Sequence, residues 1–139
     1  MKHNIVFASL ALFLLLSIAS YAQKIKFEES SVVPAASGHV NIDKDKNQNY
    51  HIMISLVNFA EVERLKTGKT TYVVWMIANQ DEPKNIGQLI SGKNLFAKKS
   101  KASFETISTE KPRKIFITAE NDGKTESPQS TVVITTGNF

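Results

Sequence analysis

The segment from residue 43 to residue 47, Asp-Lys-Asp-Lys-Asn, alternates side-chain oxygens with lysines. Alternating oxygen ligands of this kind begin the loops that bind calcium. A standard calcium loop also has glycine at its sixth position and glutamate at its twelfth, where this chain has Gln48 and Ile54. The two lysines inside the segment would also repel a cation. We therefore expect a hairpin turn here rather than a calcium site.

His39 and His51 flank this turn, on two strands that we expect to pair. If the hairpin is centred near residues 45–47, both imidazoles face outward and are diagonal neighbours. Two imidazoles bind a metal only weakly, and no third ligand has a suitable spacing. The simpler interpretation is a pair of solvated surface histidines, so we predict no metal and no other cofactor.

The chain shows no arrangement of residues typical of a catalytic site. It contains no G-x-S-x-G motif, no S-x-x-K with its supporting motifs, and no glycine-rich phosphate loop. No pair of carboxylates is placed for general acid–base catalysis. There is also no cysteine, which excludes thiol catalysis, disulfides and thiolate metal sites. We therefore expect a protein that is not an enzyme, without catalytic or cofactor-binding residues.

Residues 1–22 have the composition of a secretory signal peptide. Lys2 supplies a basic start, residues 5–19 form an apolar run, and small residues end the segment. We expect cleavage near Ala22–Gln23. Because a bilayer span needs about 20 apolar residues, the alternative of a retained membrane anchor is less favoured. The mature chain, residues 23–139, should be one domain that is periplasmic or secreted and has no membrane span.

The mature chain should carry a mild positive charge. Cleavage removes Lys2 from 17 basic residues and none of the 13 acidic ones, so the net charge falls from +4 to +3. The basic run Lys98-Lys99-Ser100-Lys101 is either a solvated loop or a contact for anionic polysaccharide or lipid. No aromatic residues are interleaved with it, so we expect no nucleic-acid partner. This run makes a surface glycan- or matrix-binding protein the alternative function.

Short apolar stretches, rich in β-branched residues and separated by turn residues at intervals of about ten, predict β-strands. The predicted strands are Lys24–Glu29, Gly38–Asp43, Tyr50–Val57, Thr70–Ala78, Ile86–Ile90, Ala102–Ile107, Lys114–Glu120 and Val132–Thr135. One or two helical turns are expected within Asn58–Lys66, where apolar residues recur at helical spacing. The pattern predicts an all-β domain, an antiparallel two-sheet sandwich of seven or eight strands, with an open barrel as the alternative.

The strand Thr70–Ala78 is apolar on both faces, as a central strand with cover on each side must be. If Trp75 points into the core with Val73 and Ile77, the alternate residues join apolar neighbours on the outer face, and such a surface is typical of an interface. The predicted interface residues are Tyr72, Val74, Met76, Phe116 and Val133. They would make the protein a binding module for another envelope protein or a second copy, unless a loop or the strand Lys24–Glu29 covers this face.

Five segments in the second half of the chain follow one another in a characteristic order: Tyr72–Ile77, Asn85–Leu89, Ile115–Glu120, Ser127-Pro128 and Val132–Ile134. In this order they resemble the C-terminal domain of anti-sigma-K factors. They are similar in order to the Y-x-L-W-L, V-x-L-G-x-L and F-x-V-T-x-E-P segments, the P-T/S-G turn and the closing V-L strand of that family. Asn121 stands where the family usually has proline. The resemblance covers about residues 38 to 137.

The resemblance implies an immunoglobulin-like extracytoplasmic sandwich that acts as an envelope sensor or binding domain. Family members also carry a cytoplasmic sigma-binding domain and a transmembrane helix, and here residues 1–22 stand in their place. The resemblance therefore does not imply inhibition of a sigma factor. It brings no ligand residues with it.

Overall fold

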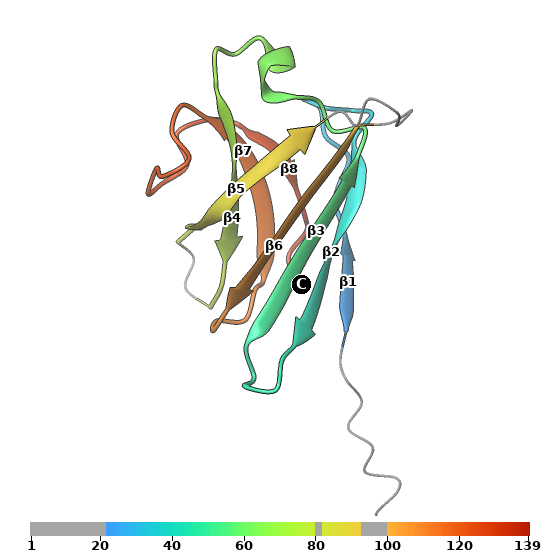
Figure 1. The fold of residues 1–139 in the computed structure, drawn as a ribbon, viewed down its shortest axis with the longest axis vertical. Coiled ribbons are helices and arrows are strands. Elements are labelled where there is room, and N and C mark those ends of the chain that lie inside the picture. Colours follow the sequence, from blue (N-terminus) through green and yellow to red (C-terminus); the bar gives the residue numbers. More distant parts are fainter. Residues whose placement is uncertain (1–21, 80–81, 93–99) are drawn as a thin grey trace, which may run out of the picture.

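The computed structural model describes residues 22–79, 82–92 and 100–139 (Figure 1). Within these ranges the chain forms eight strands and one short 3-10 helix. They are β1 (Gln23–Lys26), β2 (Ser37–Lys44), β3 (Tyr50–Val57), η1 (Val62–Leu65), β4 (Thr71–Ile77), β5 (Lys84–Gly92), β6 (Lys101–Ser108), β7 (Lys114–Glu120) and β8 (Val132–Thr135). Each strand overlaps a predicted one, and η1 lies where helical turns were expected. No helix among the described residues is long and apolar enough to cross a membrane.

The eight strands of the described residues form one antiparallel sheet in the order β1-β2-β3-β6-β5-β4-β7-β8. The sheet is strongly curled (Figure 1), and its two ends meet where Phe27, just after β1, bridges Thr136, just after β8. There the N–H of Glu28 donates to the carbonyl of Thr135 at 2.8 Å. The all-β class and the antiparallel pairing are confirmed, whereas the two-sheet sandwich is not confirmed because the strand order is continuous.

The β2–β3 hairpin shows how alternation places side chains. Val40 pairs with Ile54, and Ile42 pairs with Ile52. All four side chains are buried in the main core, while the residues between them point to the outer face of the sheet. A strand with one buried face produces this period of two, and for that reason the sequence predicted this hairpin correctly.

The faces of β4 are the reverse of those expected from the sequence. Tyr72, Val74 and Met76, expected outside, lie in the main core, and so does Val133 of β8. Their exposed fractions are 4% or less. Trp75, expected in that core, belongs to a second cluster on the opposite face. Because β4 is apolar on both faces, its own pattern could not decide which face turns inward.

The second cluster consists of Val73, Trp75 and Phe116, with Ile77 packed against it. Phe116, the remaining predicted interface residue, is only 6% exposed and stacks on Trp75. The five predicted interface residues therefore do not share one outer surface: four are inside the main core, and Phe116 lies on the other side of the sheet.

The connection between β7 and β8 covers this second cluster through a buried polar chain. The indole N–H of Trp75 donates to Thr118 Oγ1 at 2.8 Å, and that hydroxyl donates to Glu120 Oε1 at 2.7 Å. The Glu120 carboxylate also accepts from the N–H of Gln129 and the hydroxyl of Ser130. The outer face of β4 is thus closed by a loop, which was the alternative to an exposed interface.

Candidate functional site

The segment from residue 43 to residue 47, where we expected a hairpin turn rather than a calcium site, contains a turn in which the Asp45 carboxylate accepts backbone N–H groups. Asp45 Oδ1 accepts the N–H groups of Asn47 at 2.8 Å and Asn49 at 2.9 Å. The hydrogen bond from the Asn49 backbone is the largest cause that holds the pKa of Asp45 below its ordinary value. No group of three or more His, Cys, Asp or Glu residues within the described ranges could hold a metal ion.

The two histidines are not diagonal neighbours, contrary to the expectation. His39 pairs with Ser55, and His51 pairs with Asp43. The turn is centred on Asn47, one residue later than expected. As a result, each residue of β2 pairs with a residue of β3 two positions later than expected. His51 instead contacts the Glu105 carboxylate of β6, with Nε2 and Oε1 2.5 Å apart.

The basic run from Lys98 to Lys101, expected to be either a solvated loop or a contact for anionic polysaccharide or lipid, lies partly outside the described residues. Lys98 and Lys99 are not among them, and Lys101 is an exposed residue at the start of β6. Its charge is therefore available to solvent. Nothing in the described structure gathers other groups around it into a site.

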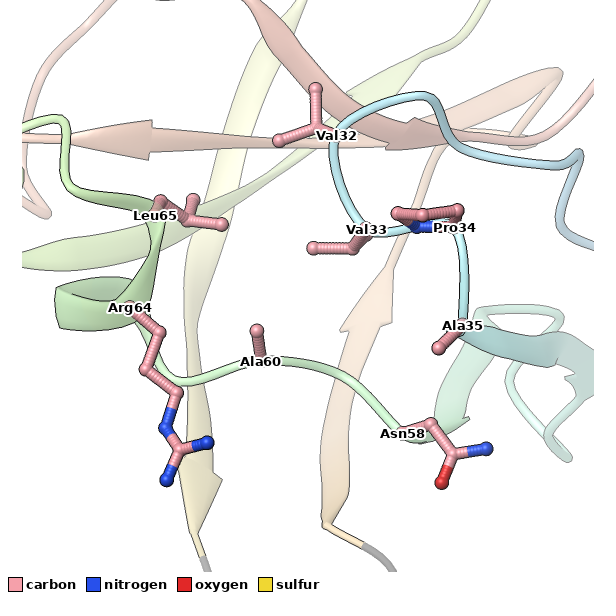
Figure 2. A pocket seen from close by; sticks show the side chains of 8 residues that line it. All are labelled: Val32, Val33, Pro34, Ala35, Asn58, Ala60, Arg64 and Leu65. Atoms are coloured by element: carbon pink, nitrogen blue, oxygen red, sulfur yellow. The ribbon is translucent and has the colours of Figure 1, made fainter.

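A hollow of about 340 Å³ opens at the end of the sheet where the connection from β1 to β2 faces the connection from β3 to β4 (Figure 2). Its lining residues are Val32, Val33, Pro34, Ala35, Asn58, Ala60, Arg64 and Leu65. Volumes of this order are typical of small-molecule sites in proteins. The two connections are more than twenty residues apart in sequence, and the pairing of Ser37 with Val57 at this end of the β2–β3 hairpin places them side by side.

Ser30 fixes the first wall of the hollow. Its hydroxyl oxygen accepts the N–H groups of Val32 at 3.1 Å and Val33 at 2.9 Å, and the hydroxyl donates to the carbonyl of Val133 in β8. The turn continues with a bond from the N–H of Ala36 to the carbonyl of Val33. A serine that bonds its own following backbone in this way defines a tight turn. The Val32–Ala35 wall is thus attached to the sheet.

Phe59 and Tyr72 fix the second wall. Phe59 is fully buried, and its ring centroid lies 4.7 Å from that of Tyr72. The Tyr72 hydroxyl donates to the carbonyl of Ala60 at 2.9 Å. Burial is the main cause that raises the pKa of Tyr72 to about 12, with the nearby Glu63 carboxylate as a further cause. The tyrosine therefore stays a neutral donor at physiological pH and holds Ala60 in place.

The centre of the hollow is apolar and its rim is polar on one side. Val33, Ala60 and Leu65 point toward one another across the opening, whereas Arg64 and Asn58 point away along one side (Figure 2). Arg64 Nε lies 3.4 Å from the Glu61 carboxylate, and its side chain is 57% exposed. The lining contains no acid, histidine or hydroxyl group, so it is suited to binding an apolar group and offers no base or nucleophile.

None of the lining residues was predicted as a site residue. The available signal was the apolar run Val32-Val33-Pro34, which stands outside every predicted strand. An apolar run in a connection must either pack on the core or line a surface hollow, and here Val33 does both: it is 5% exposed and lines the hollow. The distant partner segment had no comparable signal.

No family model, curated protein or solved structure matches this chain. The resemblance to the anti-sigma-K domain therefore stays a prediction from the residues.

Proposed function

We propose that this protein is an exported, non-enzymatic binding module of the bacterial envelope, and that it holds an apolar group of its partner in the hollow between Val33, Ala60 and Leu65. The observation that carries the proposal is that both walls of the hollow are already fixed by buried anchors, Ser30 and Tyr72. A preformed site loses little conformational entropy on binding. The signal-like residues 1–22 support export, to the periplasm or beyond the cell.

The rim indicates the chemistry of the bound group. Arg64 is the single charged residue among those that line the hollow, and its guanidinium, which already lies 3.4 Å from the Glu61 carboxylate, has further N–H groups for a partner's carboxylate. The mature chain is also positive, because removal of residues 1–22 takes away one of 17 basic residues and none of the 13 acidic ones, which leaves a net charge of +3. We therefore expect an apolar side chain followed by an acidic residue, carried by another envelope protein. The resemblance to an anti-sigma-K domain supports the same role, with an immunoglobulin-like sandwich as the finer description of the fold.

Fluorescence anisotropy of the purified protein with two labelled pentapeptides tests this function. One peptide contains Leu followed by Asp, and the other contains Leu followed by Asn. We expect the acidic peptide to bind at least about tenfold more tightly, because one good charge-assisted contact contributes on that order. Ala60→Phe fills the apolar centre and should abolish binding of both peptides.

Val132→Phe is the matched control, because it adds the same ring at an exposed position of β8 that does not line the hollow. It should bind like the parent protein. Equal binding by Ala60→Phe and Val132→Phe would show that the hollow is not the site.

Binding of anionic polysaccharide is kept as the second proposal, because Lys101 is exposed at the start of β6. Unlike binding in the hollow, binding of polysaccharide should be the same in Ala60→Phe and in the parent protein.

A further inference from the structure

β5 changes neighbours along its length, and this leaves part of β6 without a partner strand on one side. Lys84–Leu89 of β5 pairs with β4, and only Ile90–Gly92 pairs with β6, opposite Ser103–Lys101. On its other side β6 pairs with β3 along all of its residues. Within the described residues, the segment Phe104–Ser108 therefore has one paired edge and one open edge.

Gly87 and Phe104 explain why the strands separate at this point. Gly87 has a φ of +138°, and a Cβ placed there would lie 2.7 Å from Phe104 Cε2. The Phe104 ring thus lies directly against the Gly87 backbone and fills the inner side of the opening. The pairing of β5 with β4 is also irregular between Val74 and Trp75, which bends the strand. Backbone ladders between β5 and β6 cannot re-form across this ring.

The open edge has few of the features that protect strand edges. Charged side chains, proline or a bulge usually block an exposed edge, and Phe104–Ser108 contains one charged residue, Glu105, and neither lysine nor proline. On the outer face next to this edge, Ile107 is 63% exposed and Ile90 is 82% exposed. Glu105 lies on the same face as Ile107, and its side chain is 67% exposed although it also contacts His51 Nε2.

We propose that the open edge of β6 binds an extended segment of another protein by strand addition, with an apolar residue beside Ile107 and a basic residue beside Glu105. The occupant must be a single extended chain, because the opening lies between β5 and β6 in the middle of the strand order. Backbone hydrogen bonds supply affinity in this mode, and the side chains select the sequence.

The register specifies the order of the two residues. A strand antiparallel to β6 meets Ile107 first and Glu105 two residues later, on the same face. The sequence Val-Thr-Lys places valine against isoleucine and the ammonium group against the carboxylate, which are favourable cross-strand pairs. This surface is separate from the hollow, so loss of peptide binding at one site should leave peptide binding at the other site unchanged.

The probe is a labelled hexapeptide, Thr-Thr-Val-Thr-Lys-Thr, and its counterpart with glutamate in place of lysine, both titrated into the purified protein. We expect the lysine peptide to bind the parent protein and Ile107→Glu to weaken this binding at least tenfold. Val132→Glu makes the same change at an exposed position of β8 and should bind normally. Glu105→Lys should reverse the preference between the two peptides.

Hydrogen exchange locates the peptide. Bound peptide should slow exchange of backbone amides in Phe104–Ser108. The proposal is overturned if neither peptide binds, if Ile107→Glu and Val132→Glu have equal affinities, or if Glu105→Lys leaves the preference unchanged. It is also overturned if the protein forms a dimer that Ile107→Glu dissociates while the peptides remain unbound, since the edge would then serve a second copy.

Discussion

At the scale of single residues, Tyr72 connects the core with the hollow. Its side chain is 1% exposed and packs on Phe59, and its hydroxyl holds the Ala60 carbonyl. The sequence placed Tyr72 on an outer face because Trp75 was assigned to the core. Both assignments depended on which face of β4 turns toward the core. A shift of one residue along a strand moves all of its side chains to the opposite face.

The stability of the protein should fall at alkaline pH because of Tyr72. The unfolded chain ionises this phenol near its ordinary pKa of 10.0, whereas the folded protein keeps the proton up to about 12. The folded state then binds more protons, so the contribution to stability is complete below pH 10 and is lost as the pH rises to about 12. Urea unfolding at a series of pH values from neutral to about 12 measures how the free energy of unfolding changes with pH.

Tyr72→Phe should flatten this slope. It should also cost about 1 kcal/mol at neutral pH, because the buried Ala60 carbonyl loses its donor. Tyr50→Phe on β3 is the matched control, and it should keep the slope of the parent protein. If the free energy of unfolding of Tyr72→Phe fell with pH as steeply as that of the parent protein, the loss of stability at alkaline pH would not come from Tyr72.

At the scale of elements, the inward face was predictable for strands with one buried face and was not predictable for β4, which is buried on both faces. The β2–β3 hairpin buries Val40, Ile42, Ile52 and Ile54 on one face, as its alternation indicated. The position of its turn was missed by one residue, because Asp45 bonds the backbone of Asn47 and Asn49 and draws the turn toward them. Local hydrogen bonds of this kind fix register more finely than the hydrophobic pattern.

Gly87→Ala should destabilise the protein through β5. The new methyl group would meet Phe104 at 2.7 Å, and the φ of +138° is unfavourable for any residue with a Cβ. We expect a loss of about 2 kcal/mol in the free energy of unfolding, measured with urea. Gly68→Ala is the control, because its φ is +72° but no atom lies within 4 Å of the added Cβ. A loss no greater than that of the control would show that Phe104 does not restrict this position.

At the scale of the whole molecule, the sheet closes through residues that belong to no regular strand pairing. Phe27 bridges Thr136, and Ser30 bonds the carbonyl of Val133. The same serine defines the wall of the hollow that contains Val33. Closure of the sheet and formation of the hollow are therefore coupled through one side chain.

Ser30→Ala should loosen this closure. Loss of its bonds to Val32, Val33 and Val133 should reduce the free energy of unfolding by about 2 kcal/mol, since buried backbone groups lose their partners. Hydrogen exchange at the Glu28 amide should also become faster. Ser31→Ala, at an exposed neighbouring position, should change neither quantity. If Ser30→Ala left the exchange rate of the Glu28 amide unchanged, Ser30 would not be needed to hold the two ends of the sheet together.

The sequence by itself determined the all-β class, the eight strand positions and the short helical turn, because alternation and turn residues act locally. It did not determine which face of β4 is inside, since Trp75 and Val74 are equally suited to burial. It also did not indicate the hollow, because Val33 and Leu65 lie in two irregular connections whose paths no local pattern predicts. Tertiary structure decided these points: β7 supplies Glu120 beside the Trp75 face, the β7–β8 connection supplies its partners Gln129 and Ser130, and the opposite face of β4 lies in the main core.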